Sequence, residues 1–286
     1  MATILFDGIA YGMLLFLISV GLSVTLGMMG FINLAHGVFA MLGGYLLVTF
    51  MGKAGLPFLL ALPLIFVATA AFGLVLERTL YRQLYRSTHL KQVLLTVGII
   101  LLAVAAATYA FGPTQQPVKL PEMLAGQALV LELELSRYKL FLVAVGIAVT
   151  LALVFGLERT RLGARIRASV DRQSTAEAMG IHVGRVFQLT LAIGSGLAGL
   201  GGALGVNILG LDPQFPLKTL VYFLLVVVVG GAGSIPGTLL AAMVLGIADT
   251  AGKYYLPEVG AFIIYAAMVA LLLAFPQGLL GRRRLA

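Results

Sequence analysis

Two polar side chains stand out in an apolar stretch near the N-terminus: Asn33 and His36, three residues apart. On a helix this spacing places both on one face. One amide and one imidazole are too few ligands for a metal site, so we expect no metal here. Two interpretations stay open. Either Asn33 caps a helix and His36 bonds a neighbouring carbonyl, or both side chains line a pathway or hold a helix break in shape.

Other reactive patterns are weak or missing. Ile193-Gly194-Ser195-Gly196 only loosely resembles an intramembrane serine protease signature, because the first glycine is missing and no His follows it. The chain has no Cys, which excludes disulfides, thiolate metal sites and thiol nucleophiles. We therefore expect a protein that is not an enzyme and has no cofactor of its own.

Composition places these residues in a membrane protein. The 286 residues are 60% hydrophobic and only 10% charged, with a mean hydropathy of +1.06, whereas soluble domains are about a quarter charged. Apolar runs of about 20 residues match a bilayer core, and the absence of alternating polarity favours helices over a barrel. We predict a single all-α transmembrane domain over 1–286, a polytopic bundle of 8–10 helices, some discontinuous. The nine apolar segments are 4–28, 32–50, 57–77, 91–111, 138–157, 187–210, 217–230, 236–251 and 259–277.

The net charge of +8 reflects membrane topology. Thirteen of the 19 Lys and Arg residues lie in Arg78–Lys91, Arg159–Arg185 and Arg282–Arg284. The positive-inside rule assigns these loops to the cytoplasm, which leaves the N-terminus outside and the C-terminus inside. We therefore expect contact with membrane lipid and no nucleic-acid partner. The longest outer loop, at about 112–137, contains Val130–Leu135, whose alternation suggests a short strand. It is a surface hairpin or part of a docking surface for an external partner.

Two glycine-rich segments look unlike ordinary spans. Gly27–Gly44 and Gly230–Gly246 share the pattern G-x-x-G-x-I at an offset of 203 residues. Paired broken segments in two halves of a chain point to the translocation site of a transporter. A half-helix that begins near Asn33 or Ser234 would point a positive dipole end inward, which suits a carboxylate. The candidate pathway residues are Asn33, His36, Gly37, Gly230, Gly231, Gly233 and Ser234.

Small residues recur at four-residue spacing elsewhere. Gly8 and Gly12, and Gly201 and Gly205, form G-x-x-x-G pairs, and Gly194 starts a similar stripe. Such residues let helices approach closely in lipid. We expect packing inside one bundle, with a seam between subunits as the alternative.

The sequence shows little that could power transport by this chain alone. Asp7, Glu77 and Asp249 lie near predicted span ends, and mid-membrane ionisable groups of the kind used by ion-coupled carriers are nearly absent. The pattern G-x-x-x-x-G-K-[ST] is also missing, so the chain does not bind ATP in that manner. If transport is active, another protein supplies the energy.

The polar segment at about 158–186 is the candidate for contact with that protein. Glu158–Arg185 carries six of the 19 cations and includes a predicted short helix around Ser174–Met179. Ser174 and Glu177 fit a capping box, and Gly180 fits a helix-terminating position. The segment is a cytoplasmic anchor or a coupling helix that docks into an ATP-driven partner, and its length favours docking. Candidate coupling residues are Arg165, Arg167, Asp171, Glu177 and Gly180, with Arg159, Arg161 and Arg172 beside them.

Several motifs in order carry a resemblance to a known family. They are G-x-x-G-x-I-N-L-A-H-G (27–37), T-R-x-G-x-x-x-R-A (160–168), A-E-A-M-G-I (176–181), V-V-V-G-G-A-G-S-I-x-G (227–237) and P-Q-G-L-L-G (276–281). Together they make the chain similar, over essentially its full length, to the permease subunits of ABC importers for branched-chain amino acids.

The resemblance implies a multi-pass subunit of the bacterial inner membrane that moves a small amino acid inward. It implies three kinds of partner: a homologous second permease (or a second copy of this chain), two ATPase subunits that bind the ATP, and a periplasmic binding protein. Ala176–Ile181 would lie in the coupling region. The chain departs from relatives where Gly163 is followed by Ala164 and Arg165 rather than by arginine directly. Sister importers for urea, short amides or aromatic acids share these motifs, so these substrates stay open. An ion-coupled carrier and a non-transporting scaffold are the alternatives from other classes.

Overall fold

The computed structural model describes residues 1–29, 31, 33–84, 87–130, 133–171 and 173–280. Arg172 and Arg282–Arg284, singled out by the sequence, lie outside these ranges. Of Arg167 and Asp171 only the backbone is described.

The regular secondary structure of the described residues is helical apart from one small β-hairpin. The α-helices are α1 (Ala2–Met29), α2 (His36–Gly52), α3 (Phe58–Thr79), α4 (His89–Phe111), α5 (Arg137–Glu158), α6 (Arg161–Asp171), α7 (Gln173–Ala178), α8 (Val183–Leu209), α9 (Phe215–Gly230), α10 (Ile235–Tyr255) and α11 (Gly260–Ala274). Short 3-10 turns are η1 (Tyr81–Leu84) and η2 (Glu122–Leu124). Each of the nine predicted apolar segments coincides with one helix, and α6 and α7 occupy the polar segment between two of them. The prediction of a polytopic helical bundle is confirmed.

Six helices are long and apolar enough to cross a membrane, counted within the described residues: α1, α3, α4, α5, α8 and α10. At about 1.5 Å per residue, the 21 residues of α10 extend roughly 30 Å, the thickness of a bilayer core. The helices α2, α9 and α11 have 17, 16 and 15 residues and are apolar but shorter. The chain is therefore a multi-pass membrane protein.

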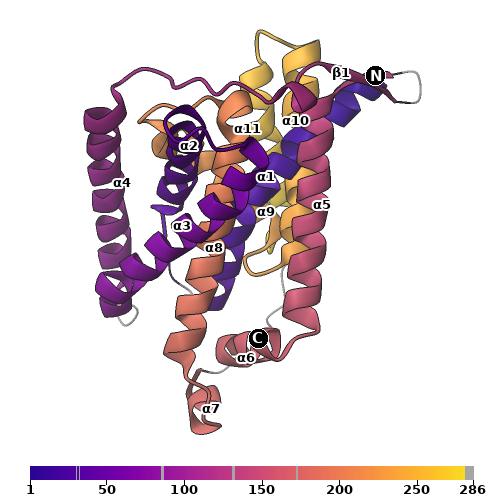
Figure 1. The fold of residues 1–286 in the computed structure, drawn as a ribbon. Helices are drawn as coiled ribbons and strands as arrows, with labels where there is room; N and C mark the ends of the chain where they lie inside the picture. Colours follow the sequence, from indigo (N-terminus) through magenta and orange to yellow (C-terminus); the bar gives the residue numbers. More distant parts are fainter. Residues whose placement is uncertain (30, 32, 85–86, 131–132, 172, 281–286) are drawn as a thin grey trace.

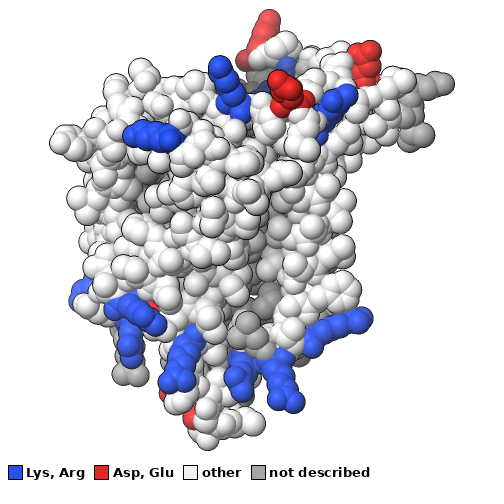
Figure 2. Space-filling view, in the orientation of Figure 1, with Lys and Arg blue, Asp and Glu red and all other residues white. Residues whose placement is uncertain are grey.

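The two ends of the bundle differ in charge. Figure 1 places the hairpin and the N-terminus at one end and η1, α6 and α7 at the other. Figure 2 shows a broad uncharged belt between them, with both signs mixed at the hairpin end and mainly Lys and Arg at the α6–α7 end. The positive-inside rule predicts that the α6–α7 end is cytoplasmic and the hairpin end is outer, and the two ends are named accordingly below. This arrangement agrees with the predicted topology.

Helices α1 and α8 form the centre of the bundle. In their most apolar 18-residue stretches 83% and 78% of residues are buried, against 28% or less in α3, α4 and α5. Glycines make this packing close: a Cβ added at Gly21 would lie 2.2 Å from the Gly194 carbonyl oxygen, and one at Gly12 would lie 2.8 Å from that of Ala242. The prediction that the small-residue stripes pack helices inside one bundle is confirmed.

Two local predictions need correction. The alternating stretch 130–135 is not one strand, because β1 (Gln127–Val130) pairs antiparallel with β2 (Leu133–Ser136) and the chain reverses between them. This matches the surface-hairpin interpretation. The second glycine-rich segment breaks at the turn between α9 and α10, as expected for a helix that begins near Ser234, but the rest of it is a continuous span. In α10, Gly237 and Gly246 lie where the backbones of Gly230 and Gly12 approach, so these glycines serve packing rather than a helix break.

Candidate functional site

The first candidate site surrounds the start of α2. Asn33 is 1% exposed, and its Oδ1 accepts a hydrogen bond of 3.3 Å from the Tyr81 hydroxyl. His36, also 1% exposed, contacts the Ile18 carbonyl oxygen through Nε2 at 2.8 Å, and this nitrogen therefore donates. The side chain of Asn33 does not cap α2, because Ala35 holds the N-cap position and no side chain bonds there. The bonding of His36 to a carbonyl is confirmed.

Within the described chain, Asn33 and His36 each use only one of their two polar side-chain atoms in a hydrogen bond. Asn33 Nδ2 and His36 Nδ1 are buried and have no hydrogen-bond partner among the described residues. Leaving a buried polar atom unpaired costs about 1–3 kcal/mol. Such groups are retained where water or another state of the protein can satisfy them. The cluster is therefore a candidate for rearrangement when the bundle changes shape.

The second glycine-rich segment forms the turn between α9 and α10. Gly231 and Gly233 have φ values of +88° and +85°, a backbone region that glycine adopts without strain. Ser234 caps α10, since its Oγ accepts a hydrogen bond of 3.1 Å from the Gly237 amide. The Gly233 amide donates to the Ser23 carbonyl at 3.0 Å, which fixes the turn against α1.

The two glycine-rich segments meet in space. A Cβ added at Gly27 would lie 2.1 Å from the Gly233 Cα, so the backbones are in contact. Gly37 packs against Pro216 at the start of α9, and the His36 and Phe223 rings lie 6.5 Å apart. Gly230 and Gly231 are buried, whereas Gly233 is exposed. None of the predicted pathway residues lines either of the two cavities described below. Within the described ranges, no group of three or more His, Cys, Asp or Glu residues could hold a metal ion.

At the cytoplasmic end, α6 lies across the ends of the spans, as Figure 1 shows. Thr160 begins this helix, because its Oγ1 accepts a hydrogen bond of 3.2 Å from the Gly163 amide at the third helical position. Gly163, Ile166 and Ser169 form a buried face at three-residue spacing. Arg161 and Arg165 are exposed, so α6 presents cations at the surface of this end.

Helix α7 is the part of the described chain that extends farthest at this end (Figure 1). Gly180 ends it with φ +80°. The Gly180 amide bonds the Glu177 carbonyl and the Ile181 amide bonds the Ala176 carbonyl, both at 3.0 Å. This pair of bonds is a Schellman motif. The predicted helix and its glycine stop are confirmed, with the helix one residue earlier. The side chain of Ser174, the predicted cap, lies outside the described residues.

A small cluster holds α7 to the first turn of α8. Ala176, Val183 and Phe187 are buried together, and Ile181 packs against them. The contact between Ile181 and Ala176 is the hydrophobic pair that accompanies a Schellman motif. The outer surface of α7 stays exposed, with Met179 76% exposed. The arrangement positions a short helix against α8 while leaving its other face exposed.

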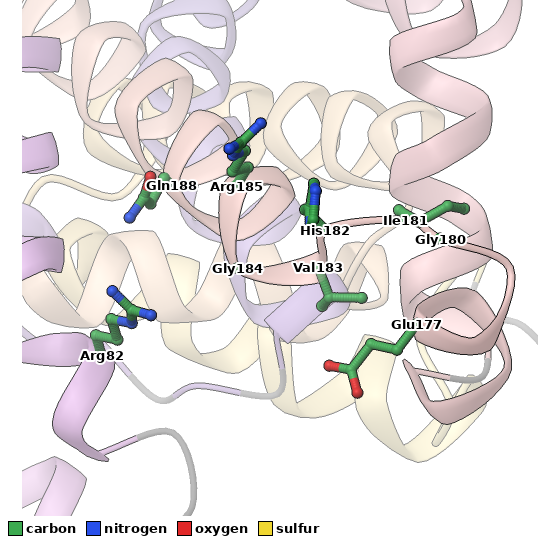
Figure 3. Close-up of a pocket in the computed structure, with 9 residues that line it drawn as sticks. All are labelled: Arg82, Glu177, Gly180, Ile181, His182, Val183, Gly184, Arg185 and Gln188. Carbon is green, nitrogen blue, oxygen red and sulfur yellow. The ribbon is translucent and has the colours of Figure 1, made fainter.

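A cavity of about 510 Å³ lies beside α7. Figure 3 shows Arg82 from η1 on one side and Glu177 on the other, with His182 and Arg185 from the start of α8 between them. The cavity thus joins the connection between α3 and α4 to the connection between α7 and α8. Groups of both signs line it, which suits a polar protein surface.

Sequence reasoning missed Tyr81, Arg82 and Thr160. Tyr81 is fully buried although it lies in the basic segment Arg78–Lys91, and its role as a partner of Asn33 depends on a contact 48 residues away. Arg82 joins the cavity in the same way, through folding alone. Thr160 carried a readable signal, because threonine is a favoured residue at the N-cap of a helix.

The sequence pattern of the family described as branched-chain amino acid transport system / permease component matches residues 4–272. The chain belongs to this permease family.

Similarity to individual members of this permease family extends over nearly the whole chain. The chain is 29% identical to the high-affinity branched-chain amino acid transport system permease protein LivH of Escherichia coli (strain K12), covering 97% of this chain and 94% of LivH. It is 27% identical to BraD of Pseudomonas aeruginosa, covering 97% and 95%. It is 28% identical to a probable LivH of Methanocaldococcus jannaschii, covering 97% and 92%. No solved structure matches the chain.

Proposed function

We propose that this protein is the transmembrane permease subunit of an ABC importer that moves branched-chain amino acids into the cell across the inner membrane. The observation that carries the proposal is the family match over 4–272 in a chain whose α7 extends from the cation-rich end of the bundle. The proteins it resembles are named for branched-chain amino acid transport.

In this proposal, two ATPase subunits dock on the cytoplasmic face formed by α6, α7 and η1. The exposed Arg165 and the residues Arg167 and Asp171 would lie on this face, with Glu177 and Gly180 beside the 510 Å³ cavity. Closure of the ATPase pair would push α7, and the cluster of Ala176, Val183 and Phe187 would transmit the movement to the central helix α8.

The translocation path would run beside the contact of the two glycine-rich segments. Asn33, His36 and Gly37 and the turn Gly230–Ser234 surround the cytoplasmic half of α1, where Gly27 meets Gly233. The unpaired nitrogens of Asn33 and His36 would find partners when the path opens. A homologous second permease, or a second copy of this chain, would form the other wall, and a periplasmic binding protein would deliver the substrate.

The test is reconstitution with candidate partners in lipid vesicles. Expression with candidate second-permease, ATPase and binding proteins should give leucine uptake that requires ATP on the α6–α7 side. Uptake by this chain alone, driven by an ion gradient and indifferent to ATP, would identify a carrier instead. Uptake of urea, a short amide or phenylalanine with no uptake of leucine would assign the chain to a sister importer.

A further inference from the structure

A second cavity, of about 420 Å³, lies at the outer end of the bundle. Five helices contribute to it: α1, α5, α8, α9 and α10. Its volume lies within the range of about 300–1,000 Å³ that small-molecule sites occupy. Ala10, Ile208 and Leu209 provide an apolar part of the wall, and Tyr11 and Tyr222 provide an aromatic part. The pathway residues considered above do not line it.

Charges of both signs face this one cavity. Asp7 and Asp249 supply carboxylates, and Lys139, Lys218 and Lys253 supply ammonium groups. Asp7 and Lys139 are 2.8 Å apart, and Asp249 and Lys253 are 2.6 Å apart. The third cation, Lys218, pairs with Asp212, which lies just outside the lining. The cavity with its three ion pairs is therefore neutral, with carboxylates and ammonium groups at several points of its wall.

Asp249 is the most unusual of these groups. Its residue is 2% exposed, although buried carboxylates are rare unless they are fully paired. One oxygen accepts a hydrogen bond from Lys253, while Oδ1 has no hydrogen-bond partner among the described residues. Asp249 lines the cavity, and Lys253 leaves part of the hydrogen-bonding capacity of its carboxylate unused, so the carboxylate has the chemistry to hold a ligand ammonium in place of Lys253.

The surroundings of Asp249 already hold an ammonium group. The Lys253 Nζ lies against the carboxylate and also 5.6 Å from the centre of the Tyr11 ring. A carboxylate and an aromatic face are the two environments that attract a primary ammonium most strongly. The Lys253 side chain is 52% exposed, so a ligand ammonium can replace it at low cost because the displaced lysine regains water.

We propose that this outer cavity binds the zwitterionic amino acid before it enters the translocation path, an inference that rests on the proposed function. The ligand ammonium is held by Asp249 and Tyr11, and its carboxylate by Lys218 or Lys139. Its side chain lies against Ile208 and Leu209. A neutral cavity whose wall carries both carboxylates and ammonium groups favours a zwitterion over an ion of either sign. An ethanolamine lipid headgroup shares the ammonium and an oxyanion, so the experiment includes it as a separate arm.

The test measures binding of radiolabelled L-leucine to the purified permease–ATPase assembly in lipid nanodiscs, without the binding protein. Asp249→Asn is expected to weaken leucine binding by at least about tenfold, because a hydrogen bond to a charged group is lost. Glu258→Gln, an exposed carboxylate of the outer end that does not line the cavity, is the matched control and should bind as the wild type does. 4-Methylpentanoate, which lacks the ammonium, and isopentylamine, which lacks the carboxylate, should compete poorly.

A second variant keeps the proposal testable if Asp249→Asn does not assemble. Thr250→Trp fills the cavity from its wall without removing a charge, and it should abolish leucine binding in assemblies that elute normally on gel filtration. Equal leucine affinity in the wild type and the cavity variants would overturn the proposal, as would binding of phosphoethanolamine by an assembly that does not bind leucine. If wild-type vesicles import leucine while the assembly does not bind it, the proposed binding site is wrong and the proposed function stands. Wild-type vesicles without any leucine import would overturn the proposed function.

Discussion

Gly180→Ala should reduce the coupling of ATP hydrolysis to transport. Gly180 has φ +80°, and an L-residue in this region costs about 1–2 kcal/mol. Nothing lies within 4 Å of the position where the new Cβ would be, so the cost comes from the backbone alone. Helix α7 has only six residues and is held by one small apolar cluster. The free energy that stabilises its ordered C-terminal end is therefore small. A loss of this size changes the population of the ordered form by about 5- to 30-fold.

The assay compares leucine transported per ATP hydrolysed in vesicles that contain the whole importer. Gly184→Ala is the matched control, because Gly184 is also exposed with nothing within 4 Å of an added Cβ but lies inside α8 without a positive φ. Gly180→Ala should transport about 5- to 30-fold less per ATP, and Gly184→Ala should behave as the wild type does. Equal coupling in the two variants would refute the role of the α7 ending. Gly180→Leu should have the same effect for the same reason.

Three further predictions concern other parts of the chain. Glu177→Arg places a third arginine at the cavity beside Arg82 and Arg185, and it should weaken retention of the ATPase subunits about tenfold in affinity purification; unchanged retention would count against this docking face. Asn33→Leu should lower leucine uptake several-fold with ATPase subunits still bound, and full uptake would leave Asn33 a structural role only. Gly27→Ala places a Cβ 2.1 Å from the Gly233 Cα, so it should destabilise the assembly by about 1–3 kcal/mol, measurable as a lower thermal unfolding midpoint; an unchanged midpoint would show that the two segments separate freely.

The positions of the membrane helices could be read from the sequence because each apolar segment must satisfy its backbone within itself. The start of α10 was readable for a related reason, since Ser234 and Pro236 carry local cap chemistry. Gly180 could likewise be identified as a stop, because a left-handed residue after a short helix is a local requirement.

Contacts between distant segments could not be read in this way. The bond between Tyr81 and Asn33 joins η1 to the start of α2, and neither local pattern specifies it. The outer cavity illustrates the same limit: Asp249 and Lys253 show an i,i+4 pair in the sequence, but Tyr11 reaches them only through the packing of α1 on α10. Glycine spacing was ambiguous as well, because the same residues break a helix or let two helices pack, and only the neighbouring backbone decides which.

The most direct test of the account is the location of α7 and the identity of its neighbour. The chain contains no cysteine, so Met179→Cys creates a single thiol at a residue that is 76% exposed. We predict that this thiol reacts with a membrane-impermeant reagent only from the cytoplasmic side and crosslinks to an ATP-hydrolysing subunit in the assembled importer. Labelling from the outer side, or cytoplasmic labelling without a crosslink to any such subunit, would contradict the account.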